Sequence, residues 1–231
     1  MIYQRVPPVL RFVPERLQRF VLHFEASIED AVRAFAGNLD SAARVLDAGA
    51  GECQYAPLLK RQRYTAVDLG VGDTSWSYRQ LDVISDLQDL PFREDTFDGC
   101  LNIVTLEHVR QPGRVLCEIG RVLKRDGRLL LVTPLEWEEH QAPHDYFRFT
   151  RYGVTLLLES AGFHVERIQP VGGFFRLLAR RMLVAPQFFR NPLGPILLLL
   201  VAPFGLMLSV LDRFDRQRAF TLGHICIARK L

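Results

Sequence analysis

Short apolar segments alternate with helical segments between residues 43 and 168, and this alternation constrains the fold more than any other feature. The predicted strands are residues 43–46, 64–67, 79–83, 97–104, 128–132 and 163–168. Predicted helices at residues 52–59 and 112–123 separate some of them, and Thr150 can cap a third helix that reaches Ser160. Strands and helices that alternate at this pace form a parallel sheet covered on both faces, so we predict an α/β fold.

Segments on either side of this core complete the predicted organisation. Apolar residues recur every three or four positions from Leu17 to Phe35, which is the spacing of one helix face, with Pro14 at its start and Gly37 at its exit. A last strand is predicted at residues 221–228. We divide the chain into an N-terminal helical segment (1–40), a core (41–170), a hydrophobic helical insert (171–220) and a final core strand (221–231).

The composition excludes several classes of protein. A chain of 231 residues with 48% hydrophobic and 24% charged residues can bury a core, which excludes a disordered chain. The net charge is +3 and the basic residues are spread along the chain, so we expect no nucleic-acid partner. The four cysteines stand far apart, without the spacing of a zinc site or a disulfide framework. Residues 1–15 lack the apolar run of a secretory signal, and we expect a cytoplasmic protein.

A glycine-rich turn follows the first predicted strand. It reads Asp47-Ala48-Gly49-Ala50-Gly51, and a strand–turn–helix of this kind offers backbone N–H groups to a ligand. Gln54 stands where a dinucleotide fingerprint needs a small residue, so a nicotinamide cofactor is disfavoured. Acidic residues flank the turn instead, since Asp68 ends the next strand. This arrangement favours a cationic ligand that carries ribose hydroxyls.

Six ordered motifs carry a resemblance to a known family. They are residues 45–51 (VLDAGAG), 67–68 (VD), 86–92 (DLQDLPF), 97–98 (FD), 106–109 (LEHV) and 121–127 (RVLKRDG). On these motifs the chain resembles the class I S-adenosylmethionine-dependent methyltransferases, specifically the methyltransferase type 11 group. The resemblance implies S-adenosylmethionine as cofactor and a Rossmann-like, seven-stranded, mostly parallel sheet with an antiparallel last strand. Cys53 departs from the family, which often has a third glycine there.

The resemblance also implies roles for individual residues. Asp47 would orient the glycine loop, Asp68 would bind the ribose hydroxyls, and Asn102 would face the sulfonium. Asp86 would meet the adenine, with Asp82 as the competing choice. The full predicted set of cofactor-binding residues is Asp47, Gly49, Ala50, Gly51, Asp68, Leu69, Asp86, Leu87 and Asn102.

Residues 140–150 follow the fifth predicted strand, where loops cover the ligand site in open α/β sheets, and we predict that they form a lid loop. Its candidate catalytic residues are His140, His144 and Tyr146. Either histidine could be a general base oriented by Asp145, could pack in the lid, or could bind a metal. Pro143 interrupts a helical histidine pair and no HExxH glutamate is present, so we predict no metal site. We interpret His108 as part of the helix-start architecture.

The methyl acceptor is constrained mainly by exclusion. The fourth strand ends in Asn102-Ile103-Val104-Thr105, which is not the Asn-Pro-Pro-aromatic motif of enzymes that methylate exocyclic amines of DNA. We therefore predict a small-molecule or lipid acceptor, methylated by in-line displacement. The alternative is a noncatalytic protein that binds S-adenosylmethionine or serves as a membrane-associated scaffold.

Residues 193–211 contain no charged side chain and are long enough for a transmembrane candidate. A single crossing would separate the two strands that flank the insert, and glycines and prolines punctuate the run, so we predict two short helices. We expect peripheral contact of residues 171–220 with the inner face of a membrane, aided by Arg176, Arg180, Arg181, Arg190 and Arg213. A cap over the substrate pocket and a homodimer contact are the open alternatives.

Overall fold

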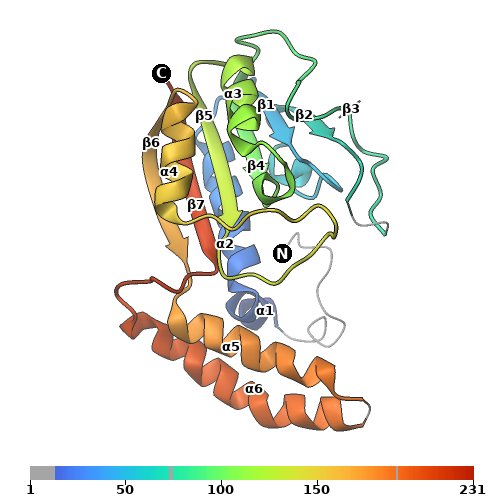
Figure 1. Ribbon diagram of the computed structural model, residues 1–231, viewed down its shortest axis with the longest axis vertical. Helices are drawn as coiled ribbons and strands as arrows, with labels where there is room; N and C mark the ends of the chain where they lie inside the picture. Colours follow the sequence, from blue (N-terminus) through green and yellow to red (C-terminus); the bar gives the residue numbers. More distant parts are fainter. Residues whose placement is uncertain (1–13, 73–74, 191) are drawn as a thin grey trace.

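Seven strands form one sheet at the centre of the computed structural model, which describes residues 14–72, 75–190 and 192–231 (Figure 1). The strands are β1 (Arg44–Ala48), β2 (Arg63–Asp68), β3 (Val83–Ile84), β4 (Phe97–Ile103), β5 (Leu123–Pro134), β6 (Phe163–Val171) and β7 (Gly223–Lys230). Their spatial order is β3-β2-β1-β4-β5-β7-β6. β7 is antiparallel to β5 and β6, and the other neighbours are parallel. The predicted seven-stranded, mostly parallel sheet with an antiparallel last strand is confirmed.

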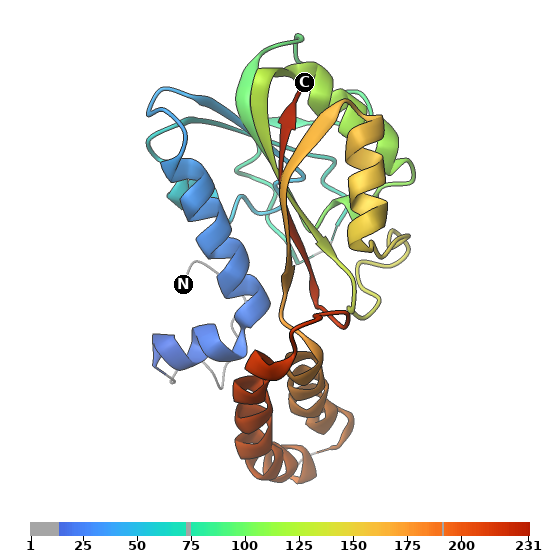
Figure 2. The same cartoon turned by 90° about the vertical axis from the view of Figure 1, so that its left-hand side faces the viewer.

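Helices cover both faces of the sheet (Figure 2). One face carries α2 (His23–Gly37), and the other carries α3 (Pro112–Val122) and α4 (Arg151–Ser160). Successive side chains of a strand point to opposite faces, and β5 illustrates the result. Leu129 and Leu131 join the hydrophobic cluster beneath α3 and α4, whereas Leu130 and Val132 join the cluster beneath α2. Both faces of the central strands are therefore buried.

The N-terminal helical segment contains two helices where the sequence predicts one. α1 (Glu15–Val21) and α2 are separated at Leu22, whose backbone leaves the helical region at φ −88° and ψ 54°. The Arg176 guanidinium donates to the Phe20 carbonyl at 2.9 Å and lies 4.8 Å from the Phe20 ring. A side chain from a distant part of the sequence thus donates a hydrogen bond to a carbonyl next to the break. We expected no secretory signal at the start of the chain. Most of that segment, residues 1–13, lies outside the described residues.

Two local predictions near the glycine loop are wrong. Residues 52–59 form turns and a short 3-10 helix (Ala56–Leu58) in place of an α-helix, because Cys53 has a positive φ of 57° and Pro57 cannot donate a helical hydrogen bond. β3 begins at Val83, later than the predicted strand at residues 79–83. The Asp82 N–H donates to the Ala66 carbonyl at 3.1 Å, whereas the Ala66 N–H donates to the Asp82 carboxylate at 2.8 Å, so a side chain supplies one of the two bonds of regular strand pairing there.

The insert between β6 and β7 forms a helical hairpin at one end of the molecule (Figures 1 and 2). It contains α5 (Phe174–Val184), a 3-10 helix (Ala185–Phe188), α6 (Leu193–Leu211) and a second 3-10 helix (Asp212–Phe214). The prediction of two short helices within residues 193–211 is wrong, because α6 continues through Pro203. Gly205 marks close packing instead, since a Cβ there would lie 3.1 Å from Leu183 on α5.

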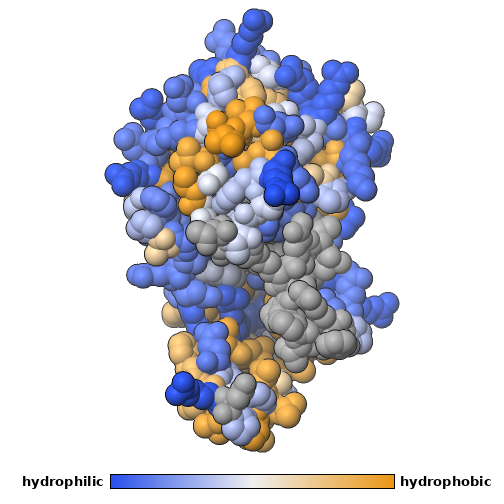
Figure 3. Space-filling model, turned by 90° about the vertical axis from the view of Figure 1, so that its right-hand side faces the viewer, coloured by the Kyte–Doolittle hydropathy of each residue, from blue (hydrophilic) through white to orange (hydrophobic). Residues whose placement is uncertain are grey.

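The outer surface of this α5–α6 hairpin is largely hydrophobic (Figure 3). Its exposed apolar side chains on α6 include Leu193, Ile196, Leu199, Leu200, Phe204, Met207 and Val210. Leu199 is 77% exposed and Leu200 is 61% exposed, although both lie in the middle of the helix. Exposed apolar surfaces larger than those of ordinary soluble proteins are typical of interaction sites.

Candidate active site

A cavity of 430 Å³ opens at the carboxyl ends of β1, β2 and β4. Ligands of open α/β sheets bind at this edge, because the loops that leave the strands meet there. Phe24 and Ile28 of α2 contribute to its wall. Ten predicted site residues line the cavity: Gly49, Ala50, Gly51, Asp68, Leu69, Asp86, Leu87, His140, His144 and Tyr146. The structure therefore brings most of the predicted residues together at one cavity, from both the glycine loop and the lid loop.

The glycine loop has a backbone conformation that side chains would disrupt. Gly49 and Gly51 have positive φ values of 89° and 52°. A Cβ on Gly49 would overlap the Thr105 side chain, and a Cβ on Gly51 would lie 3.1 Å from the Trp76 ring. The N–H groups of Gly49 and Ala50 donate to the Val67 carbonyl at 2.8 and 3.1 Å, which ties the loop to β2. Glycine is needed here for both conformation and space.

Asp68 ends β2 and places its carboxylate across the loop. Its two oxygens accept the N–H of Gly51 at 3.0 Å and the N–H of Gly70 at 2.8 Å. These bonds fix the carboxylate at the wall of the cavity. Each carboxylate oxygen has a second lone pair, so Asp68 can still accept hydrogen bonds from ligand hydroxyls.

Asp86 and Leu87 form the part of the wall predicted for the adenine. The Asp86 carboxylate accepts the Gln88 N–H at 2.9 Å, and Leu87 is 5% exposed. Asp82, the competing choice, does not belong to the cavity lining, because its carboxylate is held by the Ala66 N–H. The structure therefore places Asp86, and not Asp82, at the cavity.

Asp47 and Asn102 lie beneath the loop and do not line the cavity. The Asn102 amide donates to the Ala48 carbonyl at 2.8 Å and is fully buried. It therefore supports the end of β1, whereas we predicted that it would face the sulfonium. Asp47 accepts the Tyr64 hydroxyl at 2.7 Å. Burial raises the pKa of Asp47 to about 7, although the hydrogen bond from Tyr64 lowers it in part. Asp47 thus bonds to β2, and its role in orienting the loop stays a prediction.

The lid loop presents a histidine–tyrosine pair to the cavity. His144 Nδ1 lies 3.0 Å from the Tyr146 hydroxyl, which accepts a hydrogen bond from Arg110 at 3.3 Å. The Tyr146 N–H donates to the Glu107 carbonyl at 2.9 Å, so the backbone of the lid is fastened to the segment after β4. The pair combines a candidate proton acceptor with a hydroxyl group.

The sequence did not show which histidine Asp145 contacts, and in the structure this histidine is His140. Its carboxylate accepts the His140 N–H at 2.9 Å and binds both terminal nitrogens of Arg148 at 2.6 and 2.8 Å. The bonds from Arg148 hold the pKa of Asp145 well below its usual range. Asp145 is therefore a carboxylate that anchors the lid loop.

Glu107 and His108 are functional candidates that the sequence reasoning did not select. They lie in a short 3-10 helix (Leu106–His108) after β4, and His108 lines the cavity together with His140. Burial raises the pKa of Glu107 to about 8 and lowers the pKa of His108. His140 lies 32 residues from His108 in the chain, so no local spacing signals their contact. His108 thus faces the site in addition to forming part of the helix start.

Comparison with known proteins agrees with this geometry. A family model described as a methyltransferase domain matches residues 46–131. An uncharacterized protein of Methanocaldococcus jannaschii is 33% identical over 89 residues, which are 38% of this chain and 39% of that protein. The chain thus spans about two-fifths of the length of the curated relative that it matches.

Solved structures share the fold at low sequence identity. The [4+2]-cyclase SpnF is 23% identical with a TM-score of 0.57, over 88% of this chain and 80% of its own. A chain from the complex between the Haloferax volcanii Trm112 methyltransferase activator and the putative methyltransferase is 19% identical with a TM-score of 0.58, over 87% of this chain and 86% of its own. At these identities the likeness concerns the fold alone.

The sheet order, the glycine loop and the acidic end of β2 define a class I methyltransferase fold. Within that fold, residues 46–131 match the model of a methyltransferase domain, and this match indicates S-adenosylmethionine as the cofactor. The residues present fit this cofactor, since the loop has no room for side chains at Gly49 and the cavity wall carries the carboxylates of Asp68 and Asp86. The resemblance found in the sequence is confirmed.

Proposed function

We propose that the protein is an S-adenosylmethionine-dependent methyltransferase that acts on a lipid or lipid-linked acceptor at the inner face of a membrane. The observation that carries this proposal is the exposed apolar α5–α6 hairpin, whose Arg180 and Arg181 contact the segment that leads into the lid loop. The methyltransferase domain supports the chemistry, and the hairpin supports the choice of acceptor.

The residues of the cavity have separate tasks in this proposal. The loop at Gly49 and Gly51 and the carboxylates of Asp68 and Asp86 would hold the cofactor. When bound, S-adenosylmethionine supplies a methyl group on a positively charged sulfur. The protein contributes mainly by positioning the acceptor, because oriented reactants gain effective molarities of about 10⁵ to 10⁸ M.

The His144–Tyr146 pair supports proton removal from an acceptor hydroxyl. Arg110 donates to the tyrosine oxygen, so the tyrosine hydroxyl is free to donate to His144 Nδ1. The acceptor hydroxyl would pass its proton to the phenol oxygen of Tyr146 as the phenol passes its own proton to His144 Nδ1. General bases of this kind contribute about 10² to 10⁴-fold to a rate. An acceptor that needs no deprotonation would not depend on the pair.

α6 has the length and surface of a membrane-embedded helix. Its 19 residues extend about 28 Å at 1.5 Å per residue, close to the ~30 Å of a bilayer core. Among the described residues, the segment Leu193–Phe214 is the one helix long and apolar enough to cross a membrane, and only 11% of its most apolar 18-residue window is buried. A core helix of a soluble protein would be mostly buried.

The connections of the hairpin favour insertion into one leaflet over a complete crossing. β6 leads into α5 and α6 leads back to β7 of the same sheet, so both ends of the insert emerge on one side. Arg190 and Arg213 are exposed beyond the two ends of α6, where they can bind acidic head groups. An apolar face bounded by arginines is typical of a helix that lies in the interface.

The hairpin also contacts the segment that precedes the lid loop. The Arg180 guanidinium of α5 lies 3.7 Å from the centroid of the Trp137 ring, and Trp137 lines the cavity. Arg180 and Arg181 bind the Glu138 carboxylate at 2.7 and 3.1 Å. A membrane that holds the hairpin would therefore lie next to the entrance of the cavity, which favours an acceptor drawn from the membrane.

Flotation with vesicles of phosphatidylcholine and phosphatidylglycerol tests the proposal. The wild-type protein should float at low salt, and Leu199→Glu should reduce the floating fraction severalfold. Leu156→Glu is the matched control, because Leu156 is also exposed, at 66%, but lies on α4. A wild-type protein that remains at the bottom would contradict membrane binding.

The floating protein is then incubated with S-adenosylmethionine labelled on its methyl group and a lipid extract. Label in the lipid fraction supports the lipid acceptor. Label only in small water-soluble acceptors would contradict this choice while retaining the enzyme. Cofactor binding and flotation without transfer to any acceptor would favour the noncatalytic scaffold.

A further inference from the structure

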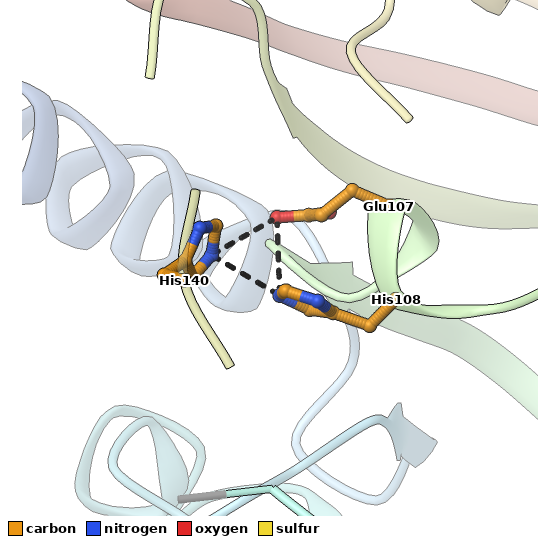
Figure 4. A group of neighbouring side chains, drawn as sticks. All are labelled: Glu107, His108 and His140. Carbon is orange, nitrogen blue, oxygen red and sulfur yellow. Dashed lines mark hydrogen bonds and ion pairs between the residues drawn. The ribbon is translucent and has the colours of Figure 1, made fainter. Parts of the chain in front are cut away.

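Glu107, His108 and His140 bring three ligand atoms to one point at the edge of the cavity (Figure 4). The Nε2 atoms of the two histidines lie 3.1 Å apart. Glu107 Oε1 lies 3.7 Å from His108 Nε2 and 4.0 Å from His140 Nε2. Three atoms at these separations share a point about 2.1 Å from each, which is the usual length of a bond from a metal to histidine nitrogen or carboxylate oxygen.

The other ring nitrogens of both histidines are already occupied. His108 Nδ1 lies 2.6 Å from the His144 carbonyl, and His140 Nδ1 lies 3.1 Å from the Glu138 carbonyl. A carbonyl oxygen only accepts, so both Nδ1 atoms carry the proton and donate. In neutral imidazoles each Nε2 then presents a lone pair, and the two lone pairs face each other. A backbone carbonyl that fixes the tautomer in this way is a regular feature of metal-binding histidines.

The Glu107 carboxyl group supplies the second observation. Its side chain has 0% exposure, and neither oxygen has a hydrogen-bond donor within the described part of the chain. Arg148 is directed to Asp145, with which it forms two short bonds, and does not pair with Glu107. A buried carboxylate without donors is costly to maintain, and a cation at the shared point would compensate it.

We infer that Glu107, His108 and His140 form a binding site for a divalent first-row transition ion. Two imidazoles and one carboxylate suit zinc and its neighbours, whereas magnesium and calcium prefer oxygen ligands. His108 and His140 both line the cavity, so the remaining coordination positions face the space beside the cofactor loop. An oxygen of the acceptor could bind there. The inference rests on this geometry and does not depend on the lipid acceptor.

This site differs from the metal site that the sequence suggested as an alternative. That option paired His140 with His144, and the geometry separates them, since His144 contacts Tyr146. His140 instead meets residues that lie more than 30 positions away in the chain. A proton shared between the two Nε2 atoms is the competing explanation of their contact, and it predicts no affinity for metal.

Cobalt(II) alone is the probe, because its visible absorption bands strengthen when it is coordinated by protein. The full chain is treated with a chelator, dialysed and titrated with cobalt(II), and bound metal is counted by equilibrium dialysis. We expect one cobalt(II) per chain with an intensified visible band. His140→Ala and Glu107→Gln should each weaken binding by more than about tenfold. His164→Ala is the control, because His164 is exposed on β6 and should leave the titration unchanged.

Two results would overturn the inference. One is a folded wild-type chain that binds no stoichiometric cobalt(II), which would leave the shared proton as the explanation. The other is binding that His140→Ala and Glu107→Gln leave intact. Circular dichroism of each variant checks its fold. If the buried Glu107→Gln variant does not fold, His140→Ala still tests the inference, since His140 lies on the lid loop.

Discussion

The buried Asp47 carboxyl makes the stability of the protein depend on pH near neutrality. Its pKa is 3.8 when exposed and about 7 in the folded protein, chiefly because of burial. Between these values the unfolded chain releases a proton that the folded chain retains, so stability falls as the pH rises. One unit of pKa difference corresponds to about 1.36 kcal/mol.

Asp47→Asn is the perturbation that isolates this effect, because an asparagine keeps the oxygen that accepts from Tyr64 but does not titrate. Between pH 5 and pH 7.5 the wild-type free energy of unfolding should fall by about 2.5 kcal/mol more than that of Asp47→Asn, given the two pKa values and 1.36 kcal/mol per unit. Glu107 affects both proteins alike, so its contribution cancels in the comparison.

Urea unfolding at the two pH values measures the difference. Asp98→Asn serves as the control, since hydrogen bonds from Lys124 and the Arg44 N–H outweigh burial and lower the pKa of Asp98. A lowered pKa confines its pH dependence to more acidic solutions, so Asp98→Asn should retain the wild-type change between pH 5 and 7.5. Equal changes in wild type and Asp47→Asn would refute the reasoning.

Three further substitutions test the fold and the loop. Gly49→Ala should abolish cofactor binding measured by calorimetry, because the added Cβ would overlap Thr105; retained binding would contradict the close packing. Thr150→Ala should cost about 1 kcal/mol in urea unfolding, because its side chain accepts the Gly153 N–H at the start of α4; an unchanged midpoint would argue against the cap. Leu116→Ala should cost about 2 to 5 kcal/mol in the same assay, since Leu116 is fully buried, and a loss below 1 kcal/mol would show that the core closes around the gap.

The strands of the core could be predicted from the sequence because their signals are local. The apolar run of β4 and the glycines after β1 determine conformation within a few residues, and the position of ligand sites in α/β sheets then follows from topology. The cap at Thr150 was also predicted, since it depends on residues only three apart.

The remaining features depend on contacts between distant parts of the chain. The break at Leu22 is accompanied by a bond between Phe20 and Arg176, which are 156 residues apart. Gly205 looks like a helix breaker in the sequence, yet it permits close packing of α6 on Leu183. The pairing of His108 with His140 likewise arises only when the lid loop folds over the cavity.

Calorimetric titration with S-adenosylmethionine and S-adenosylhomocysteine tests the central claim most directly. The wild-type protein should bind both ligands, and Asp68→Ala should weaken binding by roughly tenfold to a hundredfold, because a hydrogen bond to a charged group contributes about 1.5 to 3 kcal/mol. Asp89→Ala is the control, since Asp89 is exposed outside the cavity lining. A folded wild-type protein that binds neither ligand, or an Asp68→Ala variant with wild-type affinity, would contradict the assignment of this cavity as the cofactor site.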